Sequence, residues 1–202
     1  MIYAEMKKLH TKRTKSYQID SQNFLLSKVK YVASPNQDNR PKGSKPEIIV
    51  IHGISLPPGQ FGGEDIKDFF LNKLDETKHK FFEEIRNLKV SSHLLIDRDG
   101  KTLQFVPFDR RAWHAGESCF QGKMKCNDFS IGIELEGQDD INYSDSQYKC
   151  LVKIIKCLFD FYPDLNARKI VAHSDIAPIR KTDPGPAFDW AKFYELLYKG
   201  SL

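Results

Sequence analysis

Glu47-Ile-Ile-Val-Ile-His52 is an unbroken run of apolar, β-branched residues that ends in a histidine. Such a run predicts a buried strand, and we expect the folded domain to begin here. The shorter run Lys169-Ile-Val-Ala172 predicts another strand, and His173 follows it directly. Because both histidines stand at the ends of strands, their side chains can reach a shared face of one sheet.

Further strands and helices are expected around these two runs. Ser144-Asp-Ser-Gln147 has the pattern of a capping box, and the apolar periodicity behind it predicts a helix that ends near Tyr162-Pro163. Other segments predict strands at 90–96, 102–106 and 130–135, a hairpin turn at 97–100, and helices at 64–74 and 188–198. Because strands and helices mix without strict alternation, we expect a single α/β (α+β) domain with a central mixed β-sheet flanked by helices.

The composition is that of an ordinary globular protein. Of the 202 residues, 40% are hydrophobic and 29% are charged, and the mean hydropathy is -0.50. No apolar run approaches the roughly 20 residues that a membrane-spanning helix needs. These values exclude a membrane-spanning, a collagen-like and a wholly disordered chain.

Basic residues are concentrated near the N-terminus. Residues 1–45 contain ten Lys and Arg against three Asp and Glu, a net charge of +7, whereas residues 46–202 carry a net charge of -3. We therefore divide the chain into a basic N-terminal arm and linker, 1–45, and a folded domain, 46–202. A solvated arm is favoured over one that binds nucleic acid or a membrane surface. The N-terminus lacks the apolar core of a signal peptide, so a cytoplasmic protein with free thiols is expected.

Five side chains could together perform a hydrolysis. His52, His173 and Asp183 form a frequent hydrolytic zinc set that leaves a fourth position open for water. Taken singly, each is more often structural, as a hydrogen-bonded histidine or a turn-forming aspartate. Glu134 alternates with apolar neighbours in SIGIELEG and could serve as a general base. Lys181 could stabilise an oxyanion, or it could be a solvated lysine in a basic loop.

Four longer motifs make the chain resemble the type-2 N-acetylmuramoyl-L-alanine amidases, which are related to peptidoglycan-recognition proteins and phage amidase lysozymes. The motifs lie in the family's order between about residue 47 and residue 192, and they are HGISLPPGQFGG from 52, VPFDRRAWHAG from 106, CNDFSIGIELEG from 126 and HSDIAPIRKTDPGPAFDW from 173. Within the family, the chain is most similar to the cytosolic AmpD-type branch, which cleaves 1,6-anhydro-N-acetylmuramyl-L-alanine in peptidoglycan recycling. The resemblance implies the zinc amidase fold.

The resemblance also implies a role for each matching residue. His52, His173 and Asp183 would hold one Zn²⁺ per chain, and aspartate rather than cysteine as the third ligand is typical of the bacterial recycling branch. Glu134 would be the general base that activates water, and Lys181 would stabilise the tetrahedral oxyanion. The implied substrate is a soluble anhydromuropeptide, and neither nucleic acid nor a membrane is an expected partner.

The expected substrate contacts include several departures from the family pattern. Trp113 would stack on the sugar, and His114 beside it would line the cleft without binding metal; without the family, a half-buried core position explains Trp113 better. Gly53 stands where asparagine is expected, and Lys89 and Lys125 stand where arginines are typical. An ammonium group cannot hold a carboxylate in a bidentate grip, so binding of the peptide stem is expected to be weaker or differently tuned.

The function expected from these residues is zinc-dependent hydrolysis of the amide bond between the muramyl lactyl group and L-alanine. Three alternatives stay open: a peptidoglycan-binding module without catalysis, an amidase that acts on intact cell wall, and a basic arm that binds nucleic acid or a partner. A non-catalytic module predicts a missing ligand or base, whereas all three ligand types and the acid are present.

Overall fold

Six strands form a mixed sheet at the centre of the computed structural model, which describes residues 17–199. The strand order is β1–β5–β4–β9–β3–β10, with β1 at Lys30–Tyr31, β5 at Thr102–Gln104, β4 at Leu94–Ile96, β9 at Ser130–Glu136, β3 at Ile48–Ile54 and β10 at Ile170–Ala172. Neighbouring strands are parallel except β4 and β5, which are antiparallel. The central mixed sheet predicted from the sequence is confirmed.

β3 and β9 lie side by side in the middle of this sheet, and both are buried. The residues from Ile48 to Ile51 are at most 1% exposed, which explains the unbroken apolar run, because both faces of the strand are covered. Ile49 and Ile51 pack on one face with residues of α3 (Asp145–Phe161). Ile48 and Val50 pack on the opposite face in a separate cluster, as the alternation of a strand requires.

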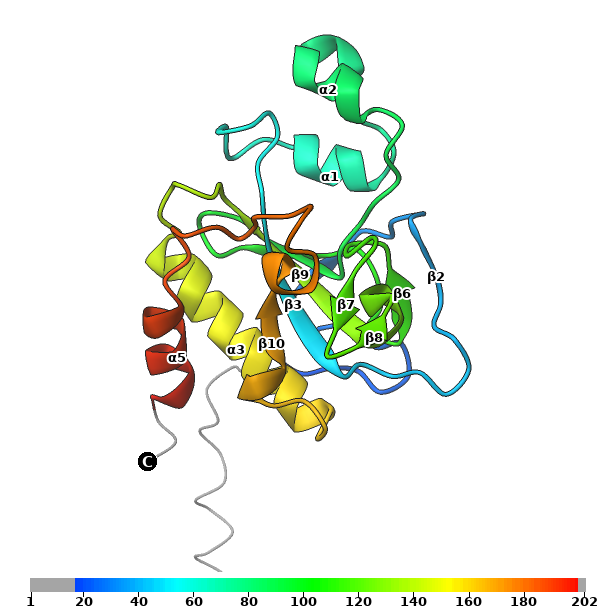
Figure 1. The fold of residues 1–202 in the computed structure, drawn as a ribbon, viewed down its shortest axis with the longest axis vertical. Helices are drawn as coiled ribbons and strands as arrows, with labels where there is room; N and C mark the ends of the chain where they lie inside the picture. The colour runs from blue at the N-terminus through cyan, green and yellow to red at the C-terminus, as the bar shows by residue number, and fades with distance from the viewer. Residues whose placement is uncertain (1–16, 200–202) are drawn as a thin grey trace, which may run out of the picture.

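α3 and α5 (Trp190–Tyr198) pack together on the first of these faces (Figure 1). The Ser144 hydroxyl accepts a hydrogen bond from the Gln147 amide, and the Gln147 side chain accepts one from the Ser144 amide. This confirms the predicted capping box. α5 begins two residues later than predicted, because the Asp189 side chain accepts from the Lys192 amide and so caps the helix.

A small helical layer lies on the other side of the sheet. α1 (Asp65–Phe70), the 3₁₀-helix η1 (Glu76–Lys78) and α2 (Lys80–Ile85) form this layer, and Figure 1 shows α1 and α2 at the top of the view, away from α3 and α5. Phenylalanines of α1 and α2 pack with Leu95 and Phe105 of the sheet region. The helix predicted at 64–74 ends early, because Asn72 adopts a left-handed φ of 58° and exchanges side-chain hydrogen bonds with Asn36.

Short elements complete the described part of the chain. β2 (Gln37–Asn39) pairs with β6 (Arg110–Ala112) and β7 (Cys119–Phe120) pairs with β8 (Lys123–Met124), while η2 (Cys126–Phe129), η3 (Ala167–Lys169) and α4 (His173–Ile176) are single helical turns or little more. The strand predicted at 90–96 covers only 94–96, since the Ser91 amide donates to the Trp113 carbonyl instead of joining the ladder. Among the helices of residues 17–199, none has the length and apolarity needed to cross a membrane.

Much of the segment expected to be an arm and linker packs on the domain. The charged stretch 7–15 lies outside the described residues, but β1 joins the edge of the sheet and Leu26 is buried in the core. Arg40 is also drawn into the interior, where its guanidinium donates to the backbone carbonyls of Phe108, Asn127, Asp128 and Ser130. These carbonyl groups hold the segment against the start of β9, and the domain boundary at residue 45 stays a prediction.

The variant Arg40→Ala tests how much the fold depends on this segment. It would remove the guanidinium donor from four partly buried backbone carbonyls, of which that of Asp128 still accepts from Ser44. We therefore expect the free energy of unfolding to fall by about 2–4 kcal/mol. Lys42→Ala, at an exposed position two residues away, is the matched control and should change the stability by less than about 0.5 kcal/mol. Urea denaturation followed by circular dichroism measures both. Equal stability of Arg40→Ala and the wild type would mean that the segment is a dispensable appendage.

Candidate active site

The sheet brings two histidines and a glutamate together at the carboxyl ends of three neighbouring strands. His52 on β3 and Glu134 on β9 are register partners in a parallel pair, so their side chains point to the same face. Ala172, the last residue of β10, pairs with Ile51, and His173 therefore follows beside His52. Ligands of such sheets commonly bind at the carboxyl ends of the strands, which makes this edge the candidate active site.

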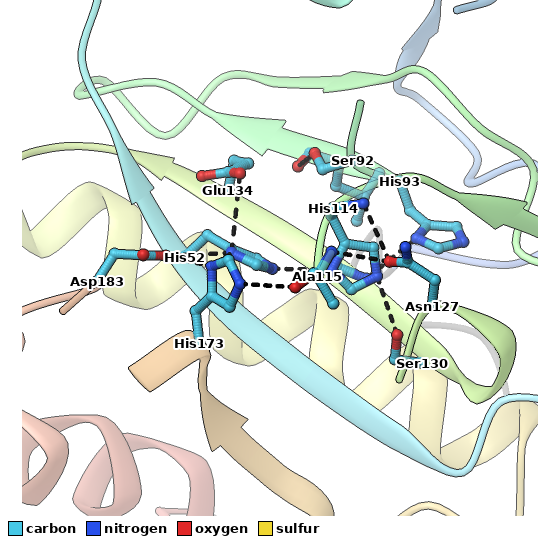
Figure 2. A network of polar contacts seen from close by, with 12 residues as sticks. His52, Ser92, His93, His114, Ala115, Asn127, Ser130, Glu134, His173 and Asp183 are labelled. Carbon is cyan, nitrogen blue, oxygen red and sulfur yellow. Dashed lines mark hydrogen bonds and ion pairs between the residues drawn. The ribbon is translucent and has the colours of Figure 1, made fainter. Parts of the chain in front are cut away.

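Three potential metal-ligand atoms form a triangle at this edge (Figure 2). Nδ1 of His52 lies 2.9 Å from Nδ1 of His173, and Oδ2 of Asp183 lies 3.1 Å from each of these nitrogens. Ligand atoms about 2.0–2.1 Å from a tetrahedral ion are separated by about 3.3 Å, close to the observed distances. The structure thus brings the three expected ligands together as a group that could hold a metal ion.

A hydrogen bond on the far side of His173 decides which of its nitrogens faces the triangle. Nε2 of His173 lies 3.1 Å from the carbonyl oxygen of Ala115, which can only accept a hydrogen bond. Nε2 therefore carries the proton, and Nδ1 presents its lone pair toward the carboxylate of Asp183. Two such electron-rich atoms in contact repel each other, so a bound cation would stabilise the arrangement.

The ionisation states of the site also suit a cation. Burial lowers the pKa of His52 to about 4, although its hydrogen bond with Asp183 acts in the opposite direction. Burial also raises the pKa of Asp183, but its hydrogen bond with His52 opposes this effect, and the pKa lies below its ordinary range. At neutral pH, His52 is therefore an unprotonated imidazole and Asp183 a carboxylate, which are the forms that bind metals.

Glu134 lies beside the triangle and has an unused oxygen. Its side chain is 11% exposed, Oε1 lies 3.9 Å from Nδ1 of His52, and Oε2 has no hydrogen-bond partner among the described residues. Burial raises the pKa of Glu134 well above its usual value, the charge of Asp183 adds to this, and Lys181 opposes it. Such a carboxyl group can exchange a proton with a molecule bound next to it. Glu136, in contrast, accepts hydrogen bonds from two loop amides and anchors those loops.

A cavity of about 280 Å³ opens over these residues. Its lining contains both polar and apolar side chains. The polar ones include His52, His114, Glu134, His173, Lys181 and Asp183, and the apolar ones include Leu56, Phe69, Phe81, Ile85, Leu88 and Val90. Trp113, Lys89 and Lys125 are not among the described residues that line it. Trp113 is half-buried and both lysines are exposed, so their contacts with a substrate stay predictions.

Tyr143 is a residue of the site region that the sequence analysis did not identify. A Cβ atom added to Gly53 would lie 2.2 Å from the Tyr143 hydroxyl oxygen, and Tyr143 is only 5% exposed. The hydroxyl donates to the carbonyl of Pro184 at 2.9 Å, directly after Asp183. Tyr143 thus fills the space where an asparagine side chain was expected, and it braces the loop of Asp183. It lies outside the four family motifs, so no spacing pointed to it.

The fold and the site together define an amidase. Residues 42–186, which include the three potential metal ligands and Glu134, match the N-acetylmuramoyl-L-alanine amidase family. The chain belongs to this family and is therefore an enzyme that hydrolyses an amide bond. The resemblance drawn from the sequence motifs is confirmed.

Within the family, the chain is similar to AmpD proteins. It is 55% identical to the 1,6-anhydro-N-acetylmuramyl-L-alanine amidase AmpD of Escherichia coli K12 over 168 residues, which cover 83% of this chain and 91% of the relative. The crystal structure of a selenomethionine AmpD derivative matches with a TM-score of 0.85 at 49% identity, over 89% of this chain and 98% of the other. The E. coli amidase AmiD, solved in complex with anhydro-N-acetylmuramic acid-L-Ala-D-gamma-Glu-L-Lys, matches with a TM-score of 0.54 at 28% identity, over 78% of this chain and 60% of the other.

A double-mutant cycle tests the contact between Gly53 and Tyr143. Gly53→Ala would press a methyl group against a buried hydroxyl, so we expect the free energy of unfolding to fall by about 1–3 kcal/mol. Tyr143→Phe removes that hydroxyl and its hydrogen bond, with an expected loss of about 1 kcal/mol.

The double variant should lose less than the two single variants together, because the remaining neighbours of the new methyl group are at least 3.4 Å away. Denaturant unfolding of all four proteins measures the coupling. Strictly additive losses would contradict the proposed contact.

Proposed function

We propose that this chain is a zinc-dependent amidase that hydrolyses the bond between the lactyl group of N-acetylmuramic acid and L-alanine in soluble 1,6-anhydromuropeptides. The observation that carries the proposal is the triangle of ligand atoms of His52, His173 and Asp183, with the unused oxygen of Glu134 beside it. The name of the E. coli AmpD relative and the molecule bound to AmiD support this choice of substrate. Because such substrates arise from cell-wall turnover, we further propose that the chain acts in peptidoglycan recycling. The family resemblance favours the cytoplasm as the place where it acts.

The zinc ion would be held by Nδ1 of His52, Nδ1 of His173 and Oδ2 of Asp183. Two imidazoles and one carboxylate are a frequent ligand set in catalytic zinc sites and leave one position open. Zinc bound in such a site supplies Lewis acidity, which makes water more acidic and polarises a carbonyl group.

Glu134 is proposed as the general base. Its carboxylate would take a proton from the attacking water as the new carbon–oxygen bond forms. It would then pass the proton to the alanine nitrogen as the carbon–nitrogen bond breaks, leaving an acid on the lactyl group and a free amine on the peptide. The burial of Glu134 supports this role, because it raises the pKa of the carboxyl group and so makes it a better proton acceptor.

Lys181 is proposed to stabilise the negative charge that develops on the carbonyl oxygen. It lines the same cavity, and its positive charge lowers the pKa values of both Glu134 and His52. A cation fixed beside the reacting bond in a partly enclosed cavity stabilises an oxyanion more effectively than water does.

The contacts with the sugar and the peptide are proposed from the family resemblance. Trp113 would stack on the pyranose, His114 would line the cleft, and Lys89 and Lys125 would attract carboxylates of the peptide stem. The apolar lining residues, which come in part from α1 and α2, share the cavity with the polar ones, and they would exclude water from the reacting bond.

Glu134→Ala is expected to keep zinc but to lose about 10²- to 10⁴-fold in turnover, because it removes the proposed proton carrier. His52→Ala is expected to lose both zinc and turnover. Atomic absorption measures the zinc content, and chromatography of released peptide measures the turnover. Glu136→Gln, on the same strand, is the matched control and should keep both. Near-normal turnover of Glu134→Ala would show that it is not the base.

The bond that is cleaved can be identified by mass spectrometry. Zinc-loaded protein incubated with 1,6-anhydro-N-acetylmuramyl-tripeptide should release intact tripeptide and free sugar. A chelator should abolish the release, and added zinc should restore it. Faster release from intact sacculi would favour the cell wall as substrate, and no release from zinc-loaded protein would favour a binding module.

A further inference from the structure

Three buried side chains form a continuous line that starts at the second nitrogen of His52. Nε2 of His52 lies 2.9 Å from Nδ1 of His114, and Nε2 of His114 lies 2.9 Å from the hydroxyl oxygen of Ser130. His52, His114 and Ser130 are 1%, 9% and 0% exposed. Figure 2 shows this line running from the ligand triangle toward the beginning of β9.

Only one placement of protons along this line allows His52 to bind a metal through Nδ1. That nitrogen must be bare, so the proton of the neutral His52 ring sits on Nε2. Nε2–H then donates to Nδ1 of His114, which leaves the proton of His114 on its own Nε2. That second N–H donates to the Ser130 hydroxyl oxygen, which accepts. If the protons sat on the other nitrogens instead, Nδ1 of His52 would be blocked.

We propose that His114 is a positioning residue that holds His52 in the tautomer and orientation needed for zinc, with Ser130 fixing His114 in turn. This inference rests on the proposed zinc site and adds a role to the substrate contact expected for His114. Groups that hydrogen-bond to the free nitrogen of a metal-bound histidine orient the ring and make it a better ligand.

The backbone of β9 leaves space for the imidazole ring of His114. A Cβ atom added to Gly132 of β9 would lie 2.5–2.7 Å from three atoms of the His114 imidazole. At this position, only glycine lets the ring approach the strand so closely. Gly132 therefore gives an independent way to displace His114 without changing any hydrogen-bonding group.

The adjacent residues His114 and Ala115 contact both of the proposed histidine ligands. The Asn127 side-chain oxygen accepts from the amides of His114 and Ala115, at 3.1 and 2.8 Å. The side chain of His114 faces His52, and the carbonyl of Ala115 faces Nε2 of His173. His114 and Ala115 thus hydrogen-bond to Nε2 of His52 and of His173, respectively. This leaves Nδ1 of each imidazole to face Asp183.

Zinc affinity is the measurement that tests the proposal directly. His114→Leu should weaken zinc binding by about 10- to 100-fold, measured by competition with a chromophoric chelator. His114→Gln should recover part of this loss, since an amide can accept from His52 and donate to Ser130. Gly132→Ala should weaken zinc binding in the same direction and keeps the proposal testable if His114→Leu does not fold.

The matched control is Gln104→Leu. Gln104 is a buried polar residue, 1% exposed, that bonds to the Leu26 amide from β5, away from the site. This variant should lose stability but keep its zinc affinity. If it lost as much zinc affinity as His114→Leu, general loosening of the fold would explain both results, and the proposal would be overturned.

A spectroscopic measurement distinguishes a role of His114 in positioning His52 from a role in the stability of the fold alone. In zinc-loaded protein, imidazole ¹⁵N chemical shifts should show protons on Nε2 of both His52 and His114, with Nδ1 of His52 bound to zinc and Nδ1 of His114 unprotonated. A proton on Nδ1 of His114, or equal zinc affinity in His114→Leu and the wild type, would overturn the inference while leaving the zinc site intact. Failure of the wild-type protein to bind zinc would overturn the proposed function and this inference with it.

Discussion

The parallel pairing of β3 with β9 is the constraint on which the site depends. Because the two strands are parallel and in register, His52 and Glu134 stand side by side and face the same way. β10, on the other side of β3, brings His173 to the same level. A slip of one residue in either pairing would turn His52, His173 or Glu134 toward the α3 face. The buried apolar runs fix the register of the strands, and they therefore also bring the side chains of the site together.

The site holds an imidazole, a carboxylate and a second carboxyl group close together in a mostly buried environment. Burial disfavours charge on His52 and on Glu134, whereas the pKa of Asp183 lies below its ordinary range, so this group stays ionised. Electron-rich atoms consequently meet without a positive charge of their own to balance them. A small divalent cation bound among these atoms would balance their negative charge.

The sheet could be predicted from the sequence because strands buried on both faces need unbroken apolar runs, as in β3. The three candidate metal ligands could be predicted only with the help of the family motifs, because spacing alone does not distinguish a metal ligand from a structural histidine. α1 was predicted too long because the turn at Asn72 depends on Asn36, a partner far away in the sequence. Tyr143 and the Ala115 carbonyl were not predictable, because a contact across the fold or a backbone atom leaves no pattern in the chain.

The strand order also determines when each strand can find its neighbours during synthesis. β3 leaves the ribosome early, but both of its neighbours, β9 and β10, come from chain that is made later. About 75 residues separate the end of β3 from the start of β9, which corresponds to roughly 4–15 s of translation at typical bacterial and eukaryotic rates. Throughout that interval, the most apolar strand of the sheet has neither neighbour to pair with. The nascent chain is then most open to aggregation and to capture by chaperones.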